Sequence, residues 1–481
     1  MSSNAGPTVA VKLFIDEEKQ RVLFAESDKE FVDVVFSFLT LPLGSIVRVL
    51  GKQSEVGCLD EIYKSVENLS IDHFQTKACK TMLLRPLNAA ASECDRLKVK
   101  VDDTNPRAIY VCPNSSCQIS CSYCSVYDAV CKSCGCSLYL KEVPLNAAVG
   151  NSEDVFFVQN GMKLIVTDDL HVYPASTSIV LSLLDKFGLQ EEDNIEEKNL
   201  ELNSNKITSL LKRVLLSKQP LTGLYFDVAL TPDAVILDQL SEEMFPKQSK
   251  DGNHKFIPIK IKLVQTKDHT SVLYAEAGQD FIDIVFGLLS VPVGSIVKAY
   301  GQWSPNGCVD NLYRSTDGSA RGCMKEECRT LLLSPKFAPF FGCTTNVLQV
   351  DELHPRVLLF KYLKCFRTHG WTSTCYCSQP LGATLMNPKS LGSADATTRA
   401  YIKGGPRNFI VTNDLRVLHF SIANTLHVLR AAKIPKDKKL VEQEVTLDRI
   451  QVLKLLRAAV FTREVLSSVL LPPKKKWHPH H

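Results

Sequence analysis

Seven cysteines lie between residues 112 and 136, the densest group of potential metal ligands in the chain. Structural Zn²⁺ is bound by four soft ligands that short turns bring together, and C-x₂-C followed by glycine is one such turn. Cys131-x₂-Cys134-Gly135 has this pattern, and Cys112-x₄-Cys117 forms a wider turn upstream. We therefore expect one structural zinc site, formed by Cys112, Cys117, Cys131 and Cys134.

Three further thiols keep other ligand sets open. Cys121-x₂-Cys124 has the more usual zinc spacing, and Cys136 follows the Cys131-x₂-Cys134 turn, so these three are alternate ligands. A second interpretation leaves the cysteines free of metal and active in redox chemistry. That interpretation requires a reactive thiol with a low pKa.

The corresponding segment in the second half of the chain, residues 360–380, has lost part of this set. Aligning Cys375-x-Cys377 with Cys134-x-Cys136 leaves Phe360 and Thr372 where Cys112 and Cys131 stand. A rearranged second site remains, although C-x-C is an awkward zinc turn; its ligands would be Cys365, His369, Cys375 and Cys377. We expect zinc to be a local crosslink of the first half.

The elements that must hold these cysteines occur twice. Residues 22–65 return without a gap as residues 272–315, and 21 of the 44 positions are identical. Later segments repeat at an offset of 245 instead of 250, because Ile165–Leu170 corresponds to Ile410–Leu415. The five-residue difference falls in the cysteine-rich segment. The chain is therefore an internal duplication.

Each copy begins with the pattern of a β-hairpin followed by helices. Alternating apolar residues and a polar turn predict the hairpin, and apolar residues at helical spacing from Phe31 to Leu39 predict a core-facing helix. Further helices are expected at residues 59–64, 176–187 and 206–217. We expect buried strands at Thr81–Leu84 and Thr330–Leu333, and a hairpin turn at Asn160-Gly161.

Strands and helices do not alternate as regular βαβ crossovers, which favours the α+β class. We expect two tandem homologous units, each a hairpin or small sheet with packed helices, the first with a zinc ribbon-like insert. The boundaries we expect are residues 9–240 for the first unit, with its cysteine-rich element at 108–140; 241–256 for a linker; 257–472 for the second unit, with its degenerate element at 360–380; and 473–481 for a basic tail.

Charge divides unequally between the halves. Residues 1–250 carry a net charge of about −9 and residues 251–481 about +13. Opposite charges on joined units favour docking of one on the other, and the basic unit could also attract a polyanion such as nucleic acid.

Three features indicate an intracellular protein, in cytoplasm or nucleus. The polar start MSSNAGPTV has no secretory signal, and the most apolar stretch, Phe31–Leu50, is amphipathic instead of membrane-spanning. The 17 cysteines are better explained in a reducing compartment as metal ligands and buried apolar residues than as disulfides. Pro473–Lys476 could serve as a short nuclear address.

Enzymatic signatures are missing from the sequence. Phosphate-binding, dinucleotide-binding, nucleophile-elbow and H-E-x-x-H motifs do not occur, so we expect no catalytic residues. Three aspartates recur in both copies, and we expect them in turns, at helix ends or on solvated faces; the pairs are Asp33 with Asp283, Asp60 with Asp310, and Asp169 with Asp414. Cys58 and Cys308 also match, and we expect buried structural thiols.

Several phrases of the sequence resemble a known family. The run VKLFID…RVLFAESDKEFVDVVFSFLTLPLGSIVRVLG, then GCLDEIYKSVENL, the cysteine segment and IVTDDLHVYPAST are similar to the plant family known as domain of unknown function 674. The resemblance covers residues 9–240 and 257–472. It implies a hairpin-helix opening, a cysteine element and a V-T-x-D-L segment, often in tandem copies, and it implies no activity.

Three hypotheses about function follow from these patterns. The first is a non-enzymatic protein-interaction scaffold with a structural zinc site and a protein partner. The second is a nucleic-acid-binding protein that uses the zinc element and the basic second unit, which steep salt dependence of binding would reveal. The third is a thiol-based redox enzyme.

Overall fold

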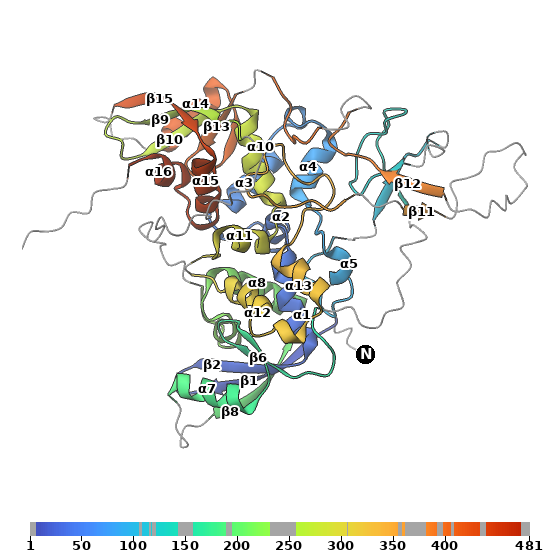
Figure 1. Cartoon of the computed structure of the whole chain (residues 1–481). Coiled ribbons are helices and arrows are strands. Elements are labelled where there is room, and N and C mark those ends of the chain that lie inside the picture. The colour runs from blue at the N-terminus through green and yellow to red at the C-terminus, as the bar shows by residue number, and fades with distance from the viewer. Residues whose placement is uncertain are drawn as a thin grey trace, which may run out of the picture.

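Two five-stranded antiparallel sheets, one from each half of the chain, dominate the computed structural model (Figure 1). The strand orders, β7-β6-β2-β1-β8 and β14-β13-β10-β9-β15, are equivalent. Helices surround both sheets, so the expected α+β class is confirmed. The structure describes residues 6–104, 108–114, 117, 122–142, 157–188, 195–230, 256–304, 306–354, 358–360, 381–391, 398–405, 408–432 and 439–472.

The first half contains eight described strands. They are β1 (Val9–Asp16), β2 (Arg21–Ser27), β3 (Ile109–Val111), β4 (Ser122–Tyr123), β5 (Leu140–Glu142), β6 (Leu164–Thr167), β7 (Val172–Pro174) and β8 (Ile195–Leu202). Its helices are α1 (Lys29–Ser37), η1 (Phe38–Thr40), α2 (Leu43–Val49), α3 (Leu59–Asn68), η2 (Ile71–His73), α4 (Lys77–Leu84), α5 (Ala91–Cys94), α7 (Thr177–Phe187), α8 (Ser204–Leu216) and α9 (Pro220–Tyr225).

The second half repeats most of these elements. Its strands are β9 (Ile259–Thr266), β10 (Val272–Ala277), β11 (Leu358–Phe360), β12 (Leu381–Leu385), β13 (Phe409–Thr412), β14 (Val417–His419) and β15 (Leu440–Leu447). Its helices are α10 (Gln279–Gly287), η6 (Leu288–Ser290), α11 (Val293–Tyr300), α12 (Val309–Asp317), η7 (Arg321–Cys323), α13 (Glu326–Leu333), α14 (Ile422–Ala431), α15 (Arg449–Phe461) and α16 (Val465–Leu470). The described helices are all too short or too polar to cross a lipid bilayer.

One apolar core runs through both halves. The helical stripe expected at Phe31–Leu39 lies in it, on α1 and η1, and its copy lies on α10 and η6. Strand β1 alternates buried and more exposed residues and pairs with β2 and β8, which places its apolar face against these helices. The sequence pattern therefore predicted correctly which faces of β1, α1 and α10 point into the core.

Helices α3 and α12 each contact the other half of the chain as well as their own, and we call them the exchanged helices. α3 contacts β14 and α10 of the second half, whereas α12 contacts β7 and α1 of the first half (Figure 1). Ser65 Oγ accepts the N–H of Val417 at 2.9 Å, and Ser315 Oγ accepts the N–H of Val172 at 3.0 Å. Because each contact has its copy, the two halves are related by approximate twofold symmetry.

The start of each exchanged helix is fixed to a helix of the other half. The N–H of Cys58 donates to the carbonyl of Ala459 on α15 at 2.8 Å. The N–H of Cys308 donates to the carbonyl of Val214 on α8 at 2.9 Å. Both bonds join backbone to backbone, so they hold the helix ends in place independently of side-chain rotamers.

Glycine permits this close approach. A Cβ on Gly57 would lie 2.2 Å from the carbonyl oxygen of Ala459, and Gly57 has a φ of +45°. A Cβ on Gly307 would lie 2.5 Å from the carbonyl oxygen of Leu215. The matching G-C pairs of the two copies are thus docking points between the halves.

A second pair of backbone hydrogen bonds between the halves lies near the approximate twofold axis. The N–H of Leu43 donates to the carbonyl of Val291, and the N–H of Val293 donates to the carbonyl of Leu41, both at 3.0 Å. These contacts and the exchanged helices cross the expected unit boundaries in both directions. The ranges 9–240 and 257–472 therefore stay a prediction about sequence repeats, and the charge-driven docking of the halves also stays a prediction.

The strands expected at Thr81–Leu84 and Thr330–Leu333 are wrong, because both segments end helices, α4 and α13. Thr76 caps α4, since its Oγ1 accepts the N–H of Cys79 at 3.2 Å. A short apolar run fits a buried strand or a buried helix equally well. The capping threonine was the available signal.

The hairpin expected at Asn160-Gly161 is also wrong. Gly161 has a φ of +81°, so a turn does form there. However, Val158 before the turn pairs with Met324 of the second half, while β6 after it pairs with β2 and β7. Val158 therefore pairs with a residue of the second half and not with the strand that follows the turn.

Several expectations fall on residues that the structure does not describe. They concern linker residues 241–255, the alternate ligand Cys121, the basic tail 473–481, and the second cysteine set Cys365, His369, Cys375 and Cys377.

Candidate metal centre

Four cysteines that were expected to bind zinc come together in the structure. The Sγ atoms of Cys112, Cys117, Cys131 and Cys134 all lie within 4.8 Å of one another, and those of Cys112 and Cys134 are 3.5 Å apart. With Zn–S bonds of about 2.3 Å, sulfurs at the corners of a tetrahedron lie roughly 3.8 Å apart. The described thiols therefore have the number, chemistry and spacing for one tetrahedral ion.

A tight turn positions the second pair. The N–H of Cys131 donates to the carbonyl of Cys136 at 2.8 Å, and the N–H of Gly135 donates to the carbonyl of Cys131 at 2.9 Å. Gly135 has a φ of +74°, a conformation that favours glycine. Val130 and Ser137 pair across the base of the turn. The C-x₂-C-G pattern thus folds as the sequence indicated.

The first pair follows strand β3. Cys112 comes directly after β3, which pairs with β5, and the carbonyl of Asn114 accepts the N–H of Cys117 at 3.0 Å. Cys112 and Cys131 are buried, Cys117 is half-buried and Cys134 is exposed. The cluster therefore lies at the surface of its element, with one thiol open to solvent.

The thiols perturb one another. The backbone N–H of Cys136 and the neighbouring thiols of Cys112 and Cys117 hold the pKa of Cys134 below its usual range. Burial, together with the thiols of Cys134 and Cys131, raises the pKa of Cys112. A set of crowded thiols that cannot all ionise is stabilised by a bound dication, which favours the thiolate of each ligand.

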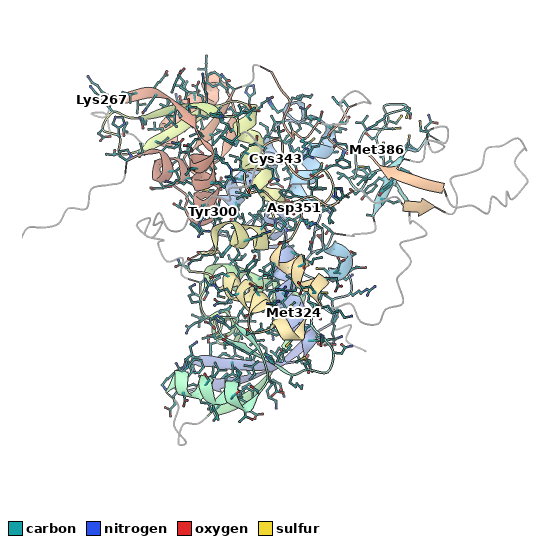
Figure 2. All side chains as sticks on the ribbon, in the orientation of Figure 1. Lys267, Tyr300, Met324, Cys343, Asp351 and Met386 are labelled. Carbon is teal, nitrogen blue, oxygen red and sulfur yellow. The ribbon has the colours of Figure 1, made fainter. Side chains whose placement is uncertain are left out.

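The cysteine-rich element joins the two halves. Strand β4 pairs in parallel with β12 of the second half, and the N–H of Met386 donates to the carbonyl of Tyr123 at 2.8 Å. Tyr123, Ile109 and Val111 form a small apolar cluster with Leu385. Figure 2 shows Met386 beside this element, away from both five-stranded sheets. The four thiols therefore sit next to a contact between the halves.

The other described cysteines lie outside the cluster. Cys124 is buried, and its Sγ accepts the N–H of Val126 at 3.4 Å. Cys136 is exposed and contributes its carbonyl to the turn. Cys58 and Cys308 are buried, as expected, and burial raises the pKa of both thiols. Their structural role stays a prediction.

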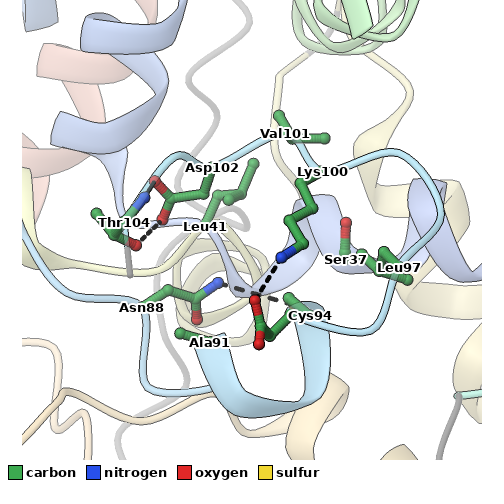
Figure 3. A pocket seen from close by; sticks show the side chains of 11 residues that line it. Ser37, Leu41, Asn88, Ala91, Cys94, Leu97, Lys100, Val101, Asp102 and Thr104 are labelled. Carbon is green, nitrogen blue, oxygen red and sulfur yellow. Dashed lines mark hydrogen bonds and ion pairs between the residues drawn. The ribbon is translucent and has the colours of Figure 1, made fainter. Parts of the chain in front are cut away.

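A small cavity lies beside another thiol, that of Cys94 (Figure 3). Its volume is about 20 Å³, enough for roughly one water molecule. Asn88 Nδ2 lies 4.0 Å from Cys94 Sγ, and burial raises the pKa of this thiol to about 12. The cavity holds no room for a substrate, and its thiol lacks the low pKa that a redox role needs.

The recurring aspartates bind nearby backbone and hydroxyl groups. Asp60 accepts the N–H groups of Ser54 and Glu55, each at 3.1 Å. Asp169 Oδ1 accepts the hydroxyl of Thr167 at 2.6 Å, as expected for a turn. The expected turns, helix ends or solvated faces are wrong for Asp33 and Asp283, which are buried inside α1 and α10. The available signal was the run of apolar residues on both sides of each aspartate.

Asp33 and Asp283 hold equivalent loops. Asp33 accepts the N–H of Val158 at 2.9 Å, and Asp283 accepts the N–H of Tyr401. Burial raises the pKa of both carboxyls, that of Asp33 to about 7. Asp283 has a buried cation nearby, Lys389, whose Nζ lies 3.4 Å from the centre of the Tyr401 ring.

We expect Asp33→Asn to change how stability depends on pH. A folded-state pKa of about 7 exceeds the unfolded value near 3.8, so between these values the native chain binds more protons than the unfolded chain. Wild-type stability should therefore fall as pH rises through this window, by roughly 4 kcal/mol at most from this carboxyl. Asparagine keeps the oxygen acceptor for Val158 and does not ionise.

Denaturant unfolding of both proteins from pH 4 to pH 8 tests this expectation. The variant should gain on the wild type as pH rises and should be the more stable of the two above pH 7. Asp185→Asn, on the exposed face of α7, is the matched control and should leave the pH profile unchanged. A constant difference between Asp33→Asn and wild type across this window would contradict the prediction.

These observations define a class of protein: an α+β chain with duplicated sheets, exchanged helices and a four-cysteine cluster. The chain belongs to the family described as "Protein of unknown function (DUF674)". The family model matches residues 5–407 and 319–481, consistent with a tandem arrangement, and this confirms the resemblance seen in the sequence. No curated protein and no solved structure matched the chain.

Proposed function

We propose that Cys112, Cys117, Cys131 and Cys134 bind one structural Zn²⁺, and that the protein is a non-enzymatic interaction scaffold whose shape this ion maintains. The observation that carries the proposal is the group of four thiols within 4.8 Å. Four protein thiolates fill the tetrahedral coordination of zinc, which is typical of structural sites, whereas catalytic sites keep one position for water or substrate.

The location of the cluster supports a role in shape. Strand β4 of the cysteine-rich element pairs with β12 of the second half, and Val126, Ala129 and Leu138 of the same element are buried in the main apolar core. The strands of this element are only two or three residues long, so a metal crosslink would add to the stability that packing on the core gives it. Zinc would hold the element folded and thereby keep the β4–β12 contact between the halves.

Metal analysis of the full-length, tag-free chain tests the proposal. We expect Cys131→Ser/Cys134→Ser to lose one equivalent of zinc relative to wild type, because two of the four ligands are removed. Cys124→Ser/Cys136→Ser is the matched control: it removes two thiols of the same element that lie outside the cluster, and it should keep the metal. Wild-type protein without zinc, or a loss confined to the control, would refute the zinc site.

Cobalt substitution separates a structural ion from a catalytic one. Co²⁺ held by four thiolates should give an absorption spectrum that does not respond to added azide or cyanide. A spectrum that shifts on addition of either anion would indicate an open coordination position and would contradict the structural role.

A further inference from the structure

The second sheet carries a hollow with a volume of about 520 Å³ at the end marked by Lys267 in Figure 2. Strands β10 and β13, the end of α14 and the loop before α16 line it. Its polar lining includes Arg416, Arg463, Thr412 and Asn413, and its apolar wall includes Val272 and Val428. A hollow of this size is typical of sites for small organic molecules.

Because the chain is duplicated, the surroundings of Arg416 and Arg463 can be compared with those of the equivalent residues in the first half. In the first half, the residue equivalent to Arg416 is His171, whose Nδ1 lies 3.2 Å from Asp169 Oδ2. The residue equivalent to Arg463 is Lys218, whose ammonium donates to the carbonyl of Gly307. Both of these positions in the first half thus have partners within the protein.

In the second half, the same two positions have no such partners among the residues that the structure describes. Arg416 Nε is buried and lacks a hydrogen-bond partner among the described residues. Within that same part of the chain, neither Arg416 nor Arg463 forms an ion pair. Of the lining carboxylates, Asp414 accepts the hydroxyl of Thr412 and Glu464 is exposed. A buried cationic donor without a partner, such as Nε of Arg416, favours binding of an anion.

The space itself arises from smaller side chains. Phe187 ends α7 in the first half, and the guanidinium of Arg21 lies 5.0 Å from the centre of its ring. Their equivalents in the second half are Ala432 and Ser271. The backbone around this position is the same in both halves. Thr222 Oγ1 accepts the N–H of Val22 in the first half, and the equivalent Ser467 Oγ accepts the N–H of Val272 in the second. The two copies therefore share the backbone around this position, but the second copy has small side chains where the first has Phe187 and Arg21.

We propose that this hollow binds a small organic anion. Its carboxylate or phosphate group would contact Arg416 and Arg463, whose planar guanidinium groups match both oxyanions. Its nonpolar part would pack on Val272 and Val428. The site is independent of the cysteine cluster and of the proposed zinc.

Calorimetric titration of the full chain with phenyl phosphate, benzoate and neutral benzyl alcohol tests the site. We expect one of the two anions to bind once per chain and benzyl alcohol not to bind measurably; the tighter anion identifies the headgroup. Arg416→Gln should weaken binding about tenfold or more, since it removes a charge-assisted hydrogen bond. Ala432→Phe should abolish binding by restoring the filling side chain of the first half.

Arg430→Gln is the matched control, because Arg430 is exposed on the same helix, α14, and does not line the hollow. It should leave the affinity unchanged. The proposal is overturned if neither anion binds at millimolar concentration, if benzyl alcohol binds as well as the anions, or if Arg416→Gln binds like wild type. Should Ala432→Phe fail to fold by circular dichroism, the comparison of Arg416→Gln with Arg430→Gln decides.

Discussion

Expressed separately, with the chain divided inside residues 241–255, neither half should fold as a stable monomer. Each half would lack the elements of the other half that contact its α3 or α12. On α3 the side chains of Leu59, Ile62, Tyr63 and Val66 are all buried. The other half supplies part of this burial. Full burial of four such side chains stabilises a protein by roughly 6–12 kcal/mol, so even a fraction of it is large beside a domain stability of about 5–15 kcal/mol.

Co-expression of the two fragments should restore a 1:1 complex with the circular dichroism spectrum and unfolding transition of the intact chain. Analytical ultracentrifugation of each fragment alone provides the decisive comparison. A monomeric half-chain that unfolds cooperatively would show that the exchanged helices are dispensable. It would also show that the two halves are independent folding units.

Gly57→Ala should destabilise the protein strongly. The new Cβ would meet the carbonyl oxygen of Ala459 at 2.2 Å, so the backbone of α15 or of the α3 start must move. The left-handed φ of Gly57 adds a penalty for a side chain. Together these effects should lower the free energy of unfolding by roughly 3–5 kcal/mol.

Gly51→Ala separates the two effects. Gly51 also has a positive φ, +64°, but no atom lies within 4 Å of the position that a Cβ would occupy there. This variant should cost only about 1–2 kcal/mol, the penalty for the left-handed conformation. Urea unfolding of both variants measures the difference. Equal losses for Gly57→Ala and Gly51→Ala would mean that the contact with Ala459 contributes nothing.

Sequence patterns predicted the local elements well where periodicity was long. The stripe from Phe31 to Leu39 and the hairpin before it needed only alternation and helical spacing. The four clustered cysteines followed from the turn geometry of C-x₂-C-G, a constraint that acts within a few residues. Short apolar runs such as Thr81–Leu84 failed, because strand and helix share that pattern.

The exchange of helices could not be predicted, and duplication is the physical reason. Ser65 and Ser315 are equivalent, as are Val172 and Val417, so own and exchanged pairings join the same residue types. A residue pattern cannot tell which copy supplies the partner. Differences between copies, by contrast, were visible in the sequence; the replacement of Phe187 by Ala432 needed the structure only to show that it opens a hollow.

The exchanged helices also govern the order of events during synthesis. The carbonyl that accepts the N–H of Cys58 belongs to Ala459, almost the whole length of the chain later. At about 5–20 residues per second, a ribosome needs roughly twenty to eighty seconds to travel from α3 to that residue. During this interval α3 gains its contacts with the second half in steps, because α10 is made first, β14 later and Ala459 last. The set of contacts that holds α3 is therefore complete only when translation is nearly finished.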